Sequence, residues 1–276
     1  MTSDRPSLTL GVRLADFAVA SRTALLRLLS PFERIVRAVR GRDGDSEPLP
    51  PLWLRRHAGP TRAFRSSGAH ALALLDQLGL LRPELRVLDF GCGPGSLVPR
   101  FAEVLGRQGR YRGLDIHAPS IDWCRRSFAG DARFSFERLD PLAPAPWPAT
   151  AGSWDLVLAK SVFTHLLEPE ARTALSEIGR TLAPGGRAML TAFLFEGSVF
   201  ANRVLPWFPC PGSTAAVRWR RAARPTAAVA VEAETFRQWL ADAGLKMESM
   251  VPGFHPGGAE PPTGQDTLVL VAERPK

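Results

Sequence analysis

Hydrophobic and polar residues follow two alternating periods between residues 69 and 273. Short apolar runs are typical of buried strands, whereas apolar residues spaced three and four apart are typical of helices. The strand-like runs are 87–90, 110–116, 133–138, 154–160, 187–195, 245–251 and 267–273, and the helical stretches are 69–78, 95–107, 119–128, 169–182 and 233–243. This alternation predicts an α/β fold whose parallel sheet carries helices on both faces.

The first 52 residues follow a different pattern. Apolar residues in 12–40 have a helical period with arginines largely on the other face, and Ser30-Pro31 is a new helix start, so two short helices are predicted. Residues 41–52 form a polar, proline-rich linker. We therefore expect an N-terminal helical extension and linker over 1–52. Packing of the extension on the core is favoured, and peripheral membrane contact through 12–40 is the alternative.

The remaining chain, 53–276, is predicted to form one domain with an internal insert. Residues 196–231 lie between a strand and a helix and are too long for an ordinary connection. The insert contains Trp207, Phe208 and Trp219 and the basic run 218–221. It is the candidate substrate cap.

The composition narrows the class of partner. The net charge is +8, but lysine occurs only at Lys160, Lys246 and Lys276, so an arginine-rich composition explains the charge without a nucleic-acid partner. The three cysteines show neither disulfide pairing nor metal-ligand spacing. No signal peptide or apolar span is evident. A cytoplasmic protein without a metal site is expected, and nucleic acid is an unlikely partner.

A glycine-rich bend follows the first strand of the predicted sheet. Gly91, Gly93 and Gly95 alternate there, and glycine allows positive φ and close approach of a ligand to the backbone. Asp89 lies inside the strand end, and Asp115 ends the next strand about 20 residues after Gly95. A carboxylate at that spacing can accept hydrogen bonds from ribose hydroxyls in a doubly wound fold.

Four segments together resemble the class I S-adenosylmethionine-dependent methyltransferases. They are residues 87–95, 113–116, 154–166 and 182–187, in the order found in that family, and the resemblance spans about residues 68–275. It implies a Rossmann-like, seven-stranded, doubly wound sheet. The last strand, 267–273, follows its predecessor without a helix and is expected to insert antiparallel.

The resemblance also implies a set of residues for the cofactor, S-adenosyl-L-methionine. The backbone of Gly91, Cys92, Gly93 and Gly95 would face the cofactor, and Asp89 would orient its amino group. Asp115 would bind the ribose hydroxyls. Ile116 would pack on the adenine, and Asp140 would accept a hydrogen bond from the adenine amine. Asp140 precedes a proline, so a role in a turn is the alternative for this residue.

The fourth strand ends at Lys160, on the side of the sheet where ligands collect, so Lys160 joins the predicted cofactor site. His165 follows closely. An imidazole can exchange a proton near neutral pH, which makes His165 the candidate general base for an alcohol or phenol acceptor. The alternative is a helix-entry turn in which the ring only hydrogen-bonds backbone.

These observations predict methyl transfer to a small-molecule, sugar or lipid- or carrier-linked acceptor; oxygen is one candidate acceptor atom, and nitrogen and carbon stay open. No Asn/Asp-Pro-Pro-Tyr/Phe tetrad follows the fourth strand, where amino-methylating DNA enzymes carry it. Two alternatives stay open. One is a catalytically idle cofactor-binding or membrane-associated scaffold with the same fold, and the other is a nicotinamide-dependent oxidoreductase.

Overall fold

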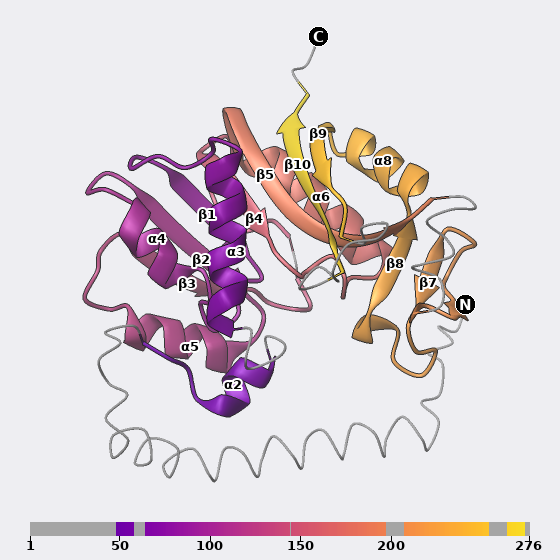
Figure 1. The fold of residues 1–276 in the computed structure, drawn as a ribbon, viewed down its shortest axis with the longest axis horizontal. Coiled ribbons are helices and arrows are strands. Elements are labelled where there is room, and N and C mark those ends of the chain that lie inside the picture. The colour runs from indigo at the N-terminus through magenta and orange to yellow at the C-terminus, as the bar shows by residue number, and fades with distance from the viewer. Residues whose placement is uncertain (1–47, 58–63, 144, 197–206, 254–263, 274–276) are drawn as a thin grey trace.

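The computed structural model describes residues 48–57, 64–143, 145–196, 207–253 and 264–273 (Figure 1). The helices predicted within 12–40 lie outside these residues. Of the described N-terminal part, α2 (Leu52–His57) is a single short helix that buries Leu54.

The central sheet has the predicted strands. They are β1 (Arg86–Phe90), β2 (Arg110–Asp115), β3 (Phe134–Arg138), β4 (Trp154–Ala159), β5 (Leu182–Phe195), β9 (Leu245–Val251) and β10 (Asp266–Ala272). Neighbouring strands run β3-β2-β1-β4-β5 in parallel, and β10 pairs antiparallel with both β5 and β9. The seven-stranded Rossmann-like sheet with an antiparallel last strand is thus confirmed.

The insert adds three strands that the sequence did not predict: β6 (Cys210–Pro211), β7 (Val217–Trp219) and β8 (Val229–Glu232). Strand β5 continues beyond the last residue pair that it forms with β4, which joins Ala159 to Leu190. The overhanging residues Phe193–Phe195 pair in parallel with β8, and β7 and β6 follow antiparallel. The described part of the insert therefore extends the sheet.

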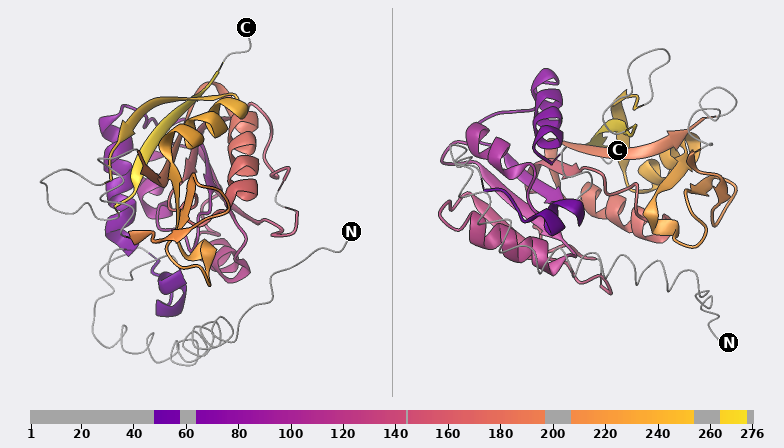
Figure 2. Two further views of the ribbon diagram at one scale, coloured as in Figure 1. Left: turned by 90° about the vertical axis from the view of Figure 1, so that its right-hand side faces the viewer. Right: turned by 60° about the horizontal axis from the view of Figure 1, so that its bottom comes forward.

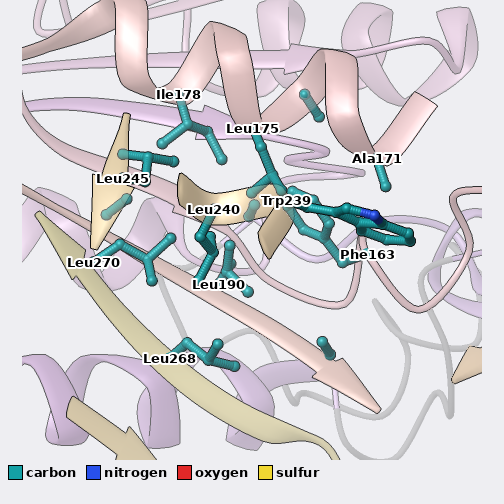
Figure 3. Close-up of a cluster of buried hydrophobic side chains, with 14 of the residues drawn as sticks. Phe163, Ala171, Leu175, Ile178, Leu190, Trp239, Leu240, Leu245, Leu268 and Leu270 are labelled. Atoms are coloured by element: carbon teal, nitrogen blue, oxygen red, sulfur yellow. The ribbon is translucent and has the colours of Figure 1, made fainter. Parts of the chain in front are cut away.

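Helices cover both faces of the sheet and form two cores. On one face lie α3 (Phe64–Gln77), α4 (Val98–Val104) and α5 (Ala118–Ser127), and on the other lie α6 (Glu168–Thr181) and α8 (Ala233–Asp242) (Figures 1 and 2). Leu175 and Ile178 of α6 pack with Leu240 of α8 on Leu190 and Leu268 of the sheet (Figure 3). Burial of such apolar surface is the main force that holds the layers together.

An ion pair joins β1 to β4 at the edge opposite the glycine bend. Asp155 accepts hydrogen bonds from the backbone nitrogen and the guanidinium of Arg86, each at 2.9 Å. This pairing holds the pKa of Asp155 below its ordinary value, although partial burial opposes it. The carboxylate therefore fixes the register at the start of both central strands.

No helix among the described residues is both long and apolar enough to cross a bilayer. The cytoplasmic location stays a prediction from the sequence.

Gly179 tests how closely α6 and α8 pack. A Cβ added at Gly179 would lie 2.6 Å from the carbonyl oxygen of Ala243, which follows α8. Gly179→Ala should therefore lower the free energy of unfolding by about 1–3 kcal/mol through overpacking. Without this contact, the same change inside a helix would stabilise by about 1 kcal/mol. Denaturant unfolding measures the sign of the change in the free energy of unfolding.

Gly130→Ala is the matched control, because its new Cβ would meet no atom within 4 Å. It should change the unfolding free energy by less than about 0.5 kcal/mol. A Gly179→Ala protein more stable than the parent would contradict the close helix contact.

Candidate functional site

The glycine bend after β1 depends on conformations that only glycine adopts easily. Gly91, Gly93 and Gly95 have φ values of 75°, 52° and 81°. A Cβ at Gly91 would also lie 2.3 Å from Cγ2 of Val162, in the segment after β4. The bend therefore brings bare backbone against the carboxyl end of β4.

Asp115 closes the bend from the end of β2. Its Oδ2 accepts the N–H of Gly93 at 2.8 Å, and its Oδ1 accepts the N–H of His117 at 2.7 Å. The structure thus places this carboxylate against the glycine bend, as the sequence predicted. A carboxylate has about four acceptor positions on its two oxygens, so an acid can accept hydrogen bonds from several donors at once, as a ribose diol requires.

The surroundings of Asp115 fit an adenosyl group. Ile116, the next residue in the chain, is 55% exposed, which provides apolar surface for a purine next to the acid. The N–H groups of Gly91 and Cys92 both donate to the Leu114 carbonyl oxygen, at 2.7 and 3.1 Å. The bend therefore offers a carboxylate for a diol and does not offer these amides to a pyrophosphate, which is the group that a dinucleotide would place there.

Asp89 lies beneath the bend and is only 2% exposed. The Tyr111 hydroxyl donates a short hydrogen bond to its Oδ2. Burial raises the pKa of Asp89 from 3.8 to about 7, and the Tyr111 hydrogen bond and the charge of Lys160 oppose that rise. Burial in turn lowers the pKa of Lys160. Asp89 and Lys160 therefore form a coupled pair of buried charges at the carboxyl ends of β1 and β4.

Two predicted cofactor residues have their polar atoms engaged within the protein. Asp140 is exposed, and its Oδ1 accepts the N–H of Leu142 at 2.9 Å, which is the turn that the sequence allowed as the alternative. The thiols of Cys92 and Cys124 both donate to the Gly93 carbonyl oxygen at 3.6 Å, and burial raises the pKa of both. These thiols serve packing under the bend rather than nucleophilic chemistry.

His165 joins the end of β4 to the insert. The ring is exposed, and its Nδ1 lies 2.9 Å from the Thr226 carbonyl oxygen. Because a carbonyl only accepts, Nδ1 carries the proton in this contact, so in the neutral ring the lone pair is on Nε2. The N–H of Val229 donates to the Thr164 carbonyl oxygen at 2.8 Å beside it. The insert therefore orients the imidazole.

The other histidine beside the bend, His117, lies 2.8 Å through Nδ1 from the Ser120 hydroxyl. It precedes α5 directly. Its ring therefore supports the start of that helix.

The basic run of the insert is largely occupied by contacts inside the insert. Arg218 donates to the carbonyl oxygens of Phe208 and Pro209 at 3.3 and 3.1 Å. Phe208 is 2% exposed, whereas Trp207 is 53% exposed and carries the Arg220 guanidinium 5.8 Å from its ring centre. Arg218 thus stabilises the β6–β7 hairpin.

Sequence reasoning missed a polar network at the carboxyl ends of β4 and β5. The Ser161 N–H donates to Thr191 Oγ1 at 2.7 Å, and both hydroxyls donate to Gln265 Oε1, at 3.0 and 2.6 Å. Ser161 has a φ of 58°, which is unusual for a residue with a side chain and is typical of strained functional sites. Nothing in the local sequence signals this conformation.

Comparisons with known proteins agree with this architecture. A family model described as a methyltransferase domain matches residues 87–186. Aklanonic acid methyltransferase DauC from Streptomyces sp. (strain C5) is 33% identical over 117 residues, which cover 42% of this chain and 51% of the relative. The chain therefore spans about half the length of that relative.

Two further matches widen the comparison. Ribosomal RNA large subunit methyltransferase E from Azoarcus sp. (strain BH72) is 27% identical over 164 residues, 52% of this chain and 77% of the relative. The crystal structure of a SAM dependent methyltransferase from Aquifex aeolicus has a TM-score of 0.53 at 15% identity and covers 81% of this chain and 98% of that one.

The fold and the site define a Rossmann-like domain built for an adenosyl cofactor. Residues 87–186 match a methyltransferase domain, and with the surrounding sheet they have the fold of the class I S-adenosylmethionine-dependent methyltransferases, whose cofactor is S-adenosylmethionine. The antiparallel β10 between β5 and β9 is the strand order expected of this family. It favours the family over the nicotinamide-dependent oxidoreductase.

Asp115→Asn tests the diol site without removing the side chain. An amide has one acceptor oxygen and one donor group, so its NH2 group must face either the Gly93 N–H or the His117 N–H, which disturbs the bend that the carboxylate holds. Binding of S-adenosylhomocysteine should weaken on the order of 10- to 100-fold, the size expected for lost hydrogen bonds to a charged group. Titration calorimetry measures the change.

Asp122→Asn, on the exposed face of α5, is the matched control and should leave the affinity unchanged. Equal affinities of the Asp115→Asn and parent proteins would remove Asp115 from the cofactor site.

Asp89 should make folding stability fall as the pH rises. Its pKa is about 7 in the folded chain against an ordinary value of 3.8, so between these values the folded state holds a proton that the unfolded chain has released. The stabilisation is full below about pH 4 and is lost as the pH approaches about 7. The melting temperature of Asp89→Asn, relative to the parent, should therefore increase between about pH 4 and 7.

Asp76→Asn on the exposed side of α3 serves as the control and should show no such trend. A parent-to-variant difference that stays constant with pH would show that Asp89 remains charged throughout.

Proposed function

We propose that this protein transfers a methyl group from S-adenosylmethionine to an oxygen atom of a small-molecule or carrier-linked acceptor. The observation that supports oxygen is the orientation of His165. Its Nδ1 donates to the Thr226 carbonyl oxygen, which leaves Nε2 as the proton acceptor at the carboxyl end of β4.

When bound, the cofactor supplies a methyl group on a sulfonium, which is activated without help from the protein. The chain has two tasks in this proposal. Asp115 and Ile116 would hold the adenosyl group beside the bend, and Nε2 of His165 would take the proton of the acceptor hydroxyl. Oxygen needs such a base because a neutral hydroxyl is a weak nucleophile.

The insert is the proposed acceptor cap within a methyltransferase domain of residues 53–276. Two contacts support this role, because the backbone of 226–229 bonds to both Thr164 and His165. A cap anchored beside the base would position the acceptor and exclude water from the site.

The names of the two relatives refer to two different classes of methyl acceptor. The name of DauC refers to a small molecule, aklanonic acid, and that of methyltransferase E refers to ribosomal RNA. In this chain Arg218 is engaged within the hairpin and Arg220 lies against Trp207. Fewer arginines of the run are then available to phosphates than the sequence suggests, so we favour the small-molecule or carrier-linked acceptor.

His165→Gln should lower the rate of methyl transfer about 10²- to 10⁴-fold, the range of a lost general base, while S-adenosylhomocysteine binding stays unchanged. The assay follows radiolabelled methyl from S-adenosylmethionine into phenolic and hydroxylated small molecules and, in a separate arm, into ribosomal RNA. The rate loss should shrink as the pH rises, because the acceptor hydroxyl then ionises without a base.

His70→Gln is the matched control, because this exposed histidine on α3 also bonds a backbone carbonyl oxygen through Nδ1. It should retain the parent rate. Unchanged turnover in His165→Gln would remove the base from the mechanism, and labelling of RNA alone would replace the acceptor class. Cofactor binding without any methyl transfer would favour the idle scaffold.

A further inference from the structure

We propose that Tyr111 is a positioning residue of the cofactor site, and that its hydroxyl holds the Asp89 carboxylate beneath the glycine bend, ready for the cofactor's amino group. This inference rests on the proposed function and on the role that the family resemblance implies for Asp89, which is to orient the amino group of S-adenosylmethionine. It adds a residue that the sequence motifs do not include.

The strand register explains why Tyr111 and no nearer residue reaches the acid. In the parallel pair β1–β2, Asp89 lies opposite Gly113, and Tyr111 lies two positions earlier on the same face. Gly113 has no side chain to offer. A Cβ there would lie 2.8 Å from both Cys92 Sγ and Phe136 Cδ1. The diagonal neighbour Tyr111 therefore takes the contact.

Aromatic packing fixes the direction of the hydroxyl. The Tyr111 ring is 1% exposed and lies 5.5 Å from the ring centres of Phe101 and Phe134 and 6.1 Å from that of Phe136. Buried tyrosines normally find one hydrogen-bond partner for the hydroxyl, and here the partner is Asp89 Oδ2. A ring held on three sides can present that hydroxyl in only one place.

Several groups decide whether Asp89 is charged. Tyr111 from β2 and Lys160 after β4 favour the carboxylate, whereas burial and the neighbouring charge of Asp115 favour the acid. The thiols of Cys92 and Cys124 also lie close enough to interact with it electrostatically. The pKa of about 7 is the balance of these effects. A cofactor ammonium would favour the carboxylate, so binding and loss of this proton should be linked.

This linkage predicts the direction in which Tyr111→Phe should shift the pH dependence of S-adenosylhomocysteine binding. In the parent, the affinity for S-adenosylhomocysteine should rise with pH across the range in which Asp89 ionises. Loss of the hydroxyl removes a donor that stabilises the carboxylate, so the midpoint of this rise should move to higher pH. The shift should be about one pH unit, the size of one hydrogen bond to a charged group. Calorimetric titrations at a series of pH values measure it.

A merely structural role of Tyr111 predicts something else. Phe128 packs on Phe134 and Phe136, at 6.2 and 5.9 Å between ring centres, so Phe128→Leu disturbs the same aromatic cluster one ring further from Tyr111; it should lower stability and keep the midpoint of the parent. If Tyr111→Phe also keeps the parent midpoint, the hydroxyl does not position Asp89 and the inference is wrong. If the parent fails to bind S-adenosylhomocysteine at any pH, the proposed function fails instead.

A second measurement on the parent protein tests the same proposal if the Tyr111→Phe variant does not fold. Tyr111 is the single tyrosine of the chain, so 3-fluorotyrosine gives one fluorine resonance. That resonance should shift with pH as Asp89 ionises and shift again on addition of S-adenosylhomocysteine, and Asp89→Asn should remove the pH-dependent step. A resonance insensitive to both pH and S-adenosylhomocysteine would overturn the proposal.

Discussion

The carboxylate of Asp115 is the contact on which the cofactor site depends. It joins the end of β2 to the glycine bend after β1, because one oxygen accepts the Gly93 N–H and the other accepts the His117 N–H. The same contact fixes the start of α5, since His117 directly precedes that helix. One acid therefore sets the position of the bend, the helix behind it and the apolar surface of Ile116 beside it.

The backbone of two glycines lies so close to neighbouring side chains that even a methyl group would disturb the arrangement. Gly91 leaves no room for a Cβ against Val162, and Gly113 leaves none against Cys92. Gly91 lies where the end of β1 meets the segment after β4, and Gly113 lies where β2 meets the segment after β1. The site is thus assembled from three parallel strands that end at the same edge, and glycine is required where their ends meet.

Most of the fold could be predicted from the sequence because its signals are local. Apolar runs mark every strand of the seven-stranded sheet, and helical periods mark the helices that cover it. The spacing of Asp89, the glycines and Asp115 marks the bend. The strands of the insert could not be predicted in this way. β8 pairs with β5 because β5 extends beyond its last residue pair with β4. The lengths of β4 and β5 in the sheet follow from the register of the strands rather than from local sequence.

The same limit applies to the site. Asp115 is recognisable from its place at a strand end, whereas Tyr111 contacts Asp89 only because Gly113 lies opposite the acid in the register of β1 and β2. The left-handed conformation of Ser161 likewise depends on Thr191 and Gln265, which are distant in the sequence. Asp140 shows the opposite case, because the local turn signal of Asp-Pro describes its observed contact well.

The two halves of the site differ in how they are held, and this difference bears on function. The cofactor side is fixed by buried contacts of β1 and β2. The proposed acceptor side is fixed by the insert, whose Thr226 carbonyl oxygen orients His165 and whose Val229 N–H binds Thr164. In the proposed function, a change in the insert would therefore alter the acceptor and the base together while the adenosyl site stays intact. Such a division allows one fold to serve many methyl acceptors, because the part that chooses the acceptor is separate from the part that binds the donor.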